Sequence, residues 1–161
     1  MAHGAKRADQ AMTAILTGRC QCGAVTYRAK AEAKGYACHC LDCQKQSSSA
    51  FGISLSMDTT NLTVEGELGS YTKTADSGAQ TDCYFCPSCG SRIYHEGKSR
   101  PGKVTIKAGT LDDTSALQLT GHLWVSRKQP WLHLGEELPV WLTQPTAPDE
   151  WEMLWSGGRE E

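Results

Sequence analysis

The chain has 161 residues, a formal net charge of −2 at neutral pH and a 39% share of hydrophobic residues. This length suits one domain, or one domain with tails, and the mildly acidic balance gives no general basic field for non-specific nucleic-acid binding. The first ten residues are polar and charged, and no apolar run approaches the ~20 residues of a membrane helix, so neither a signal peptide nor a membrane span is predicted.

Short segments of alternating apolar and polar residues predict a mostly β fold. Residues 1–15 are predicted to be a disordered leader. Strands are expected at 23–29, 51–57, 62–64, 68–71, 91–94, 104–108, 119–125 and 138–142. One short helix is expected at 41–48. Residues 16–143 would then form the domain.

Residues 144–161 are predicted to be a C-terminal tail, since they contain two prolines and two glycines. Trp151 and Trp155 suggest that this tail docks against the same subunit or another one. Trp131, Trp141, Trp151 and Trp155 are many tryptophans for one late segment, and aromatic residues are enriched at interfaces, so a homodimer is predicted.

Eight cysteines fall into three groups, and this clustering is the main chemical signal of the sequence. The groups are Cys20 and Cys22, then Cys38, Cys40 and Cys43, then Cys83, Cys86 and Cys89. Thiols two or three residues apart form strained disulfides but easily reach one metal ion together. In the reducing cytoplasm expected for a chain without a signal peptide, they indicate metal or redox chemistry.

Cys20, Cys22, Cys86 and Cys89 are predicted to hold a structural zinc. Pro87 fixes a turn, and Gly90 permits a positive φ directly after the last ligand, as in a zinc knuckle. The alternative is a thioredoxin-like redox pair, which needs a strand-to-helix setting, whereas residues 91–94 look like a strand.

Cys38, Cys40 and Cys43 supply three ligands within six residues, which predicts a second zinc with an open position, as in catalytic sites. Such a position accepts water or a substrate thiol. The alternative is a closed site completed by His39, which is expected to point outward, or by Cys83 or another histidine.

Cys83 could also replace Cys89 in the C-x-x-C register, but it is expected to be a buried free thiol on a strand. Lys45 and the hydroxyls at 47–49 follow the second cluster directly. They would either anchor a substrate carboxylate or form an ordinary polar loop. His95 is expected to face solvent.

These motifs resemble the family of glutathione-dependent formaldehyde-activating enzymes, which also contains the centromere protein V type. The matching blocks are residues 18–25, 38–45, 85–91, 109–113 and 122–131. The resemblance implies a β-tent fold, with several coiled antiparallel sheets organised around zinc, over residues 16–143. It also implies two zinc ions per chain, with the first and third cysteine groups holding the structural one.

The implied activity is that of a carbon–sulfur lyase like S-(hydroxymethyl)glutathione synthase, which joins glutathione to formaldehyde or a related carbonyl. The alternative is a non-catalytic, zinc-scaffolded binding module for a protein or nucleic-acid partner. The acidic balance and the three-cysteine group favour the enzyme, with a small thiol as partner.

Overall fold

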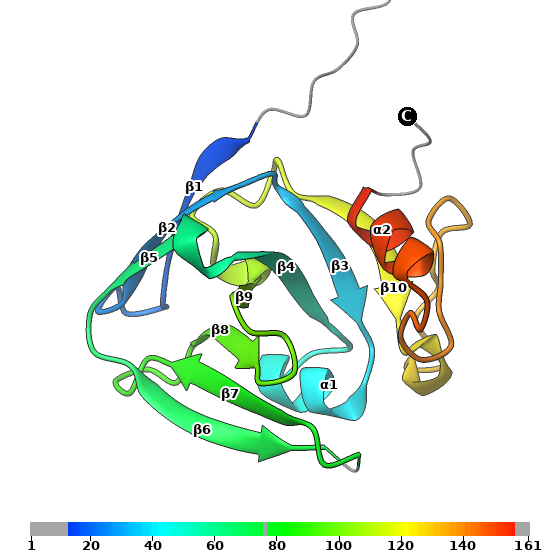
Figure 1. Ribbon diagram of the computed structural model, residues 1–161, viewed down its shortest axis with the longest axis horizontal. Helices are drawn as coiled ribbons and strands as arrows, with labels where there is room; N and C mark the ends of the chain where they lie inside the picture. Colours follow the sequence, from blue (N-terminus) through cyan, green and yellow to red (C-terminus); the bar gives the residue numbers. More distant parts are fainter. Residues whose placement is uncertain (1–12, 76, 157–161) are drawn as a thin grey trace, which may run out of the picture.

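The computed structural model describes residues 13–75 and 77–156, which form two β-sheets (Figure 1). The smaller sheet has the order β1-β2-β5 and is antiparallel throughout. Its strands are β1 (Ala14–Arg19), β2 (Thr26–Ala31) and β5 (Leu62–Glu65). The expected leader at 1–15 lies mostly outside the described residues, and its boundary is corrected because β1 already begins at Ala14.

The larger sheet has the order β10-β3-β4-β9-β8-β7-β6, and only its β10–β3 pair is parallel. Its strands are β3 (Lys34–Cys38), β4 (Gly52–Asp58), β6 (Gly69–Thr74), β7 (Gln80–Phe85), β8 (Arg92–Gly97), β9 (Lys103–Lys107) and β10 (Gln118–Leu123). Three short 3-10 turns are η1 (Thr59–Asn61), η2 (Ala108–Thr110) and η3 (Val125–Arg127). The predicted mostly β fold is therefore confirmed.

The main core lies where the two sheets face each other. Strand β2 alternates strictly between exposed and buried positions, so Tyr27 and Ala29 point inward, where they join Leu55 of β4 and Ile106 of β9. This period-two pattern is what allows one face of a sheet to be buried. The core thus holds together strands that come from both halves of the chain.

The two α-helices lie at different places on the larger sheet. Helix α1 (Leu41–Ser47) follows β3, in agreement with the predicted helix. Helix α2 (Pro148–Ser156) packs on β10 and β3, on the far side of the molecule from the smaller sheet (Figure 1). Within residues 13–75 and 77–156, neither helix has the length and apolar character needed to cross a bilayer.

The predicted tail contains helix α2, which docks on its own subunit. Leu154 is completely buried, next to Leu123 of β10 and Cys38 of β3. The start of the helix is stabilised by hydrogen bonds that Glu150 accepts from the backbone amides of Thr146 and Ala147.

Two predictions about strands need correction. No strand forms at 138–142, where the backbone makes only a single bridge between Val140 and His122. Pro139 has no amide hydrogen, which limits the ladder that this segment can form. Conversely, β1 and β3 were not predicted. Strand β3 contains Gly35, whose lack of a side chain permits close approach: an added Cβ would lie 2.8 Å from the carbonyl oxygen of Ser54.

Candidate metal centres

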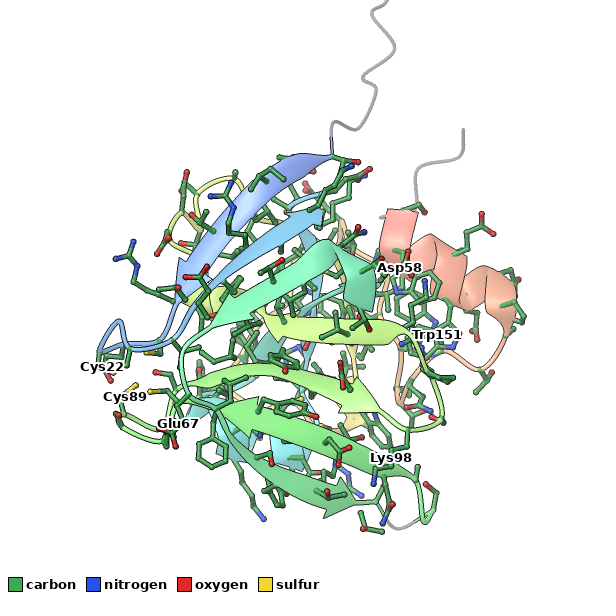
Figure 2. All side chains as sticks on the ribbon, turned by 60° about the vertical axis from the view of Figure 1, so that its left-hand side comes forward. Cys22, Asp58, Glu67, Cys89, Lys98 and Trp151 are labelled. Atoms are coloured by element: carbon green, nitrogen blue, oxygen red, sulfur yellow. The ribbon has the colours of Figure 1, made fainter. Side chains whose placement is uncertain are left out.

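The first cysteine cluster joins two distant connections between strands. The Sγ atoms of Cys20, Cys22, Cys86 and Cys89 all lie within 4.8 Å of one another. The distance from Cys20 Sγ to Cys22 Sγ is 3.5 Å, and that from Cys22 Sγ to Cys86 Sγ is 3.8 Å. Four sulfurs at ~2.3 Å around a tetrahedral zinc would be about 3.8 Å apart, so these four fit zinc well. Figure 2 shows Cys22 and Cys89 together at one end of the molecule, opposite α2.

Two backbone turns with glycine hold these sulfurs in place. The amide of Gly23 donates to the carbonyl oxygen of Cys20 at 3.1 Å, and the amide of Gly90 donates to that of Cys86 at 2.8 Å. Gly23 and Gly90 have φ values of +80° and +76°, which side chains rarely permit. The positive φ expected at Gly90 is therefore observed, and Gly23 adopts a similar conformation.

Ser91 links the two knuckles. Its Oγ accepts a hydrogen bond from the amide of Gln21 at 3.0 Å and lies 3.2 Å from Cys89 Sγ. The hydrogen bond from Ser91 lowers the pKa of Cys89 to about 5, which favours the thiolate that binds metals. Cys86 and Cys89 lie between strands β7 and β8, so the strand-to-helix setting of a thioredoxin-like pair is absent at this point.

The second cluster is local in sequence and lies where β3 runs into α1. The Sγ atoms of Cys38, Cys40 and Cys43 also lie within 4.8 Å of one another. Cys40 caps α1, and its Sγ accepts a hydrogen bond from the amide of Cys43 at 3.4 Å. Hydrogen bonding with Cys38 lowers the pKa of Cys40 to about 2, while hydrogen bonding with Cys40 raises the pKa of Cys38. The cluster therefore favours at least one thiolate.

Among the described residues, no fourth cysteine, histidine or carboxylate joins this group of three. His39, expected to point outward, is instead fully buried, and its Nε2 lies 3.1 Å from Nδ1 of His122. Cys83 is buried in β7 and belongs to neither cluster; its Sγ donates to the carbonyl oxygen of Thr81 at 3.7 Å. Its predicted state, a buried thiol on a strand, agrees with this placement.

A cavity of about 390 Å³ borders the second cluster at Cys43. Polar residues on its wall include Ser47, Ser49, Ser91, Arg92 and Lys107, and no aspartate or glutamate of the described chain lines it. Lys45 is exposed on α1 and does not line the cavity. The cavity is thus lined both by Cys43 of the three-cysteine cluster and by two cationic side chains, Arg92 and Lys107.

Sequence reasoning missed Arg92 and Lys107. Arg92 begins β8 and Lys107 ends β9, where single cations look like ordinary solvent-facing strand residues. In the structure, the Nε and Nη2 atoms of Arg92 are buried without a hydrogen-bond partner among the described residues. Burial lowers the pKa of Lys107, although the nearby Cys43 thiolate opposes this shift. Only the pairing of strands, which sequence does not reveal, brings these cations to one cavity.

His95 was expected to face solvent, but it lies in β8 with its Nδ1 atom buried and unpaired among the described residues. Burial lowers its pKa to about 3. The imidazole of His95 is therefore neutral in the folded protein at neutral pH.

A crystal structure of a Rhodobacter sphaeroides protein from structural genomics has 22% sequence identity to this chain and a TM-score of 0.49, over 60% of this chain and 87% of that one. No curated protein matches the chain. The family of glutathione-dependent formaldehyde-activating enzymes matches residues 15–127, a segment that includes all eight cysteines. The resemblance seen in the sequence is thereby confirmed, and the chain belongs to the family of glutathione-dependent formaldehyde-activating enzymes.

Proposed function

We propose that this protein is a zinc-dependent carbon–sulfur lyase of the S-(hydroxymethyl)glutathione synthase type. Its substrates would be glutathione, or a similar small thiol, and formaldehyde or a related carbonyl. The observation that carries this proposal is the group of three cysteine sulfurs, with no fourth ligand among the described residues, at the edge of a cavity.

The two clusters would have different tasks. Cys20, Cys22, Cys86 and Cys89 would hold a structural zinc, since four sulfurs complete a tetrahedron. Cys38, Cys40 and Cys43 would hold the second zinc, which when bound there would keep a substrate thiol in its nucleophilic thiolate form. In the forward reaction a bond forms between the thiol sulfur and the carbonyl carbon, and the thiol proton ends on the carbonyl oxygen. The lyase reaction is the reverse.

The chain supplies position rather than a strong base. The cavity of about 390 Å³ falls in the range of small-molecule sites, so it can hold a thiol and a small carbonyl next to each other. Its lining also includes the apolar side chains of Phe51 and Ile53. All eight cysteines are free thiols, which suits a reducing compartment such as the cytoplasm.

The test is to replace zinc by cobalt and titrate glutathione. We expect a saturable change in the thiolate-to-metal charge-transfer absorption, and its loss in Cys40→Ser. Cys83→Ser is the matched control, because Cys83 is buried but lies outside both clusters, and it should respond like the wild type. No response to glutathione or other small thiols would contradict the proposed activity and favour the binding-module alternative.

A further inference from the structure

Arg92 and Lys107 are two cations on the wall of the cavity that borders Cys43. They belong to the neighbouring antiparallel strands β8 and β9, so the sheet holds them in a fixed relation to each other. Helix α1 contributes Cys43 to the lining of the same cavity. One cavity thus connects a metal-binding cluster with a cationic wall.

Neither cation forms an ion pair with a carboxylate of the described chain. The ion pairs formed within the described chain use other lysines and arginines, namely Arg19, Lys34, Lys73, Lys98 and Lys103. Arg92 donates no hydrogen bond from Nε or Nη2, to a cysteine sulfur or to any other described group. A buried guanidinium without partners is costly, and an anion entering the cavity would remove that cost.

The surroundings favour an anion with oxygen atoms. No aspartate or glutamate of the described residues lines the cavity, so no carboxylate of the protein competes there for the two cations. Ser49 and Thr110, which carry hydroxyl groups, also line the cavity. Arginine in particular matches the planar geometry of a carboxylate.

We propose that Arg92 and Lys107 bind a carboxylate of the thiol substrate while its sulfur lies beside Cys38, Cys40 and Cys43. This inference deepens the proposed function and rests on it. The sequence left open whether Lys45 or the hydroxyls at 47–49 anchor the carboxylate or form an ordinary polar loop, and Lys45 does not line the cavity. The pair would make the enzyme selective for thiols that carry a carboxylate.

The experiment compares glutathione with glutathione diethyl ester, which has the same thiol but no free carboxylate. Binding to the cobalt-loaded protein is followed by the charge-transfer absorption. We expect the wild type to bind glutathione at least 10-fold more tightly than the ester. Arg92→Gln and Lys107→Met should each weaken glutathione binding about 10-fold and leave ester binding unchanged. Lys45→Gln, a cation on α1 outside the cavity, is the control and should preserve the selectivity.

The outcomes separate the two levels of the proposal. If the wild type binds neither thiol, the proposed function itself is wrong. If it binds both equally, the carboxylate subsite is wrong while thiol binding stands. If the variants bind glutathione and the ester more weakly by the same factor, the cations only offset the charge of the thiolates. That result also overturns the carboxylate subsite. Should a variant fail to fold, the wild-type ratio of the two affinities still decides.

Discussion

Two buried cysteines three residues apart, Cys83 and Cys86, have different surroundings and should differ in their contribution to stability. Both are almost inaccessible to solvent, but only Cys86 belongs to a four-sulfur cluster. Replacing Cys86 removes a proposed zinc ligand from the cluster that joins the β7–β8 connection to the β1–β2 connection. Replacing Cys83 exchanges one buried thiol for a hydroxyl beside the carbonyl oxygen of Thr81.

We therefore expect Cys86→Ser to lose one zinc per chain and most of its soluble yield, because the binding free energy of a structural zinc is also folding free energy, on the order of 10 kcal/mol. Cys83→Ser should keep both metals and lose only about 1–2 kcal/mol. Zinc analysis and thermal melting measure both effects. A wild-type melting curve for Cys86→Ser would remove the structural role of this cluster.

The second residue-scale prediction concerns acid. His95 is partly buried, with its Nδ1 atom inaccessible and a pKa of about 3, whereas an unfolded histidine has a pKa of about 6.5. Above pH 6.5 both states are neutral and the fold has its full stability. As the pH falls from about 6.5 toward 3, the His95 imidazole binds a proton in the unfolded state but stays neutral in the folded state. Stability then decreases by at most about 1.4 kcal/mol per pH unit.

His95→Gln should remove this part of the pH dependence. The measurement is the difference in melting temperature between pH 7 and pH 5.5, which should be several degrees smaller in the variant. His133 is exposed, so His133→Gln should keep the wild-type difference. If the melting temperature of His95→Gln changes between pH 7 and pH 5.5 as much as that of the wild type, His95 does not cause this pH dependence.

At the scale of elements, helix α2 links the tail to the second cysteine cluster. Leu154 belongs to a small core with Leu123 and Cys38, against which Trp141 and Trp151 pack. Gly121 of β10 lets α2 approach closely, since an added Cβ would lie 2.9 Å from Leu154. The helix is therefore part of the support of Cys38, a ligand of the proposed second zinc.

We expect Leu154→Ala to lower the free energy of unfolding by about 2–5 kcal/mol, because it leaves a cavity in this small core. It should also speed the release of the second zinc. Its neighbour Met153 is 47% exposed, so Met153→Ala should change stability by less than about 0.5 kcal/mol. Chemical unfolding and a zinc-release assay follow the two effects. Equal stability of the two variants would contradict the docking role of α2.

Sequence predicted those elements whose signal is local. Helix α1 and the turn at Gly90 follow from local residue types, and the sulfurs of both cysteine clusters lie together as the spacing indicated. Strand β3 was missed because Gly35 and Ala37 give little hydrophobic alternation. Arg92, His95 and Lys107 were missed for another reason: their burial depends on how β8 pairs with its neighbours, which only the folded sheet determines.

At the scale of the whole molecule, the predicted homodimer rests on fewer tryptophans than the sequence suggested. Trp141 and Trp151 pack inside the chain, and Arg100 lies 5.4 Å from the ring centre of Trp155. Trp131 is 65% exposed and is the one of the four that is most available to a partner. We expect light scattering to give twice the 17.5 kDa of one chain, and Trp131→Ala to give the monomer. A wild-type monomer would end this prediction.

The two cysteine clusters should also differ in how their loss affects the whole molecule. The first cluster joins the β1–β2 connection of the smaller sheet to the β7–β8 connection of the larger one, so losing its proposed zinc would remove one link between the sheets. The second lies within six residues at the end of β3, and its proposed zinc has three protein ligands instead of four. Three ligands bind more weakly than four, and the open position admits competitors.

Graded chelation should therefore release zinc in two steps. We expect the zinc of the second cluster to leave at low chelator concentration, without loss of the β-sheet circular dichroism signal. The zinc of the first cluster should leave only at higher concentration, together with unfolding. Cys43→Ser should abolish only the early release of zinc, because it removes a proposed ligand of the second cluster and leaves the four cysteines of the first cluster intact. Simultaneous release of both metals with unfolding, in the wild type, would contradict the division into a structural and a labile site. The division matters for function, since only a zinc that exchanges ligands without unfolding the chain can accept a substrate thiol.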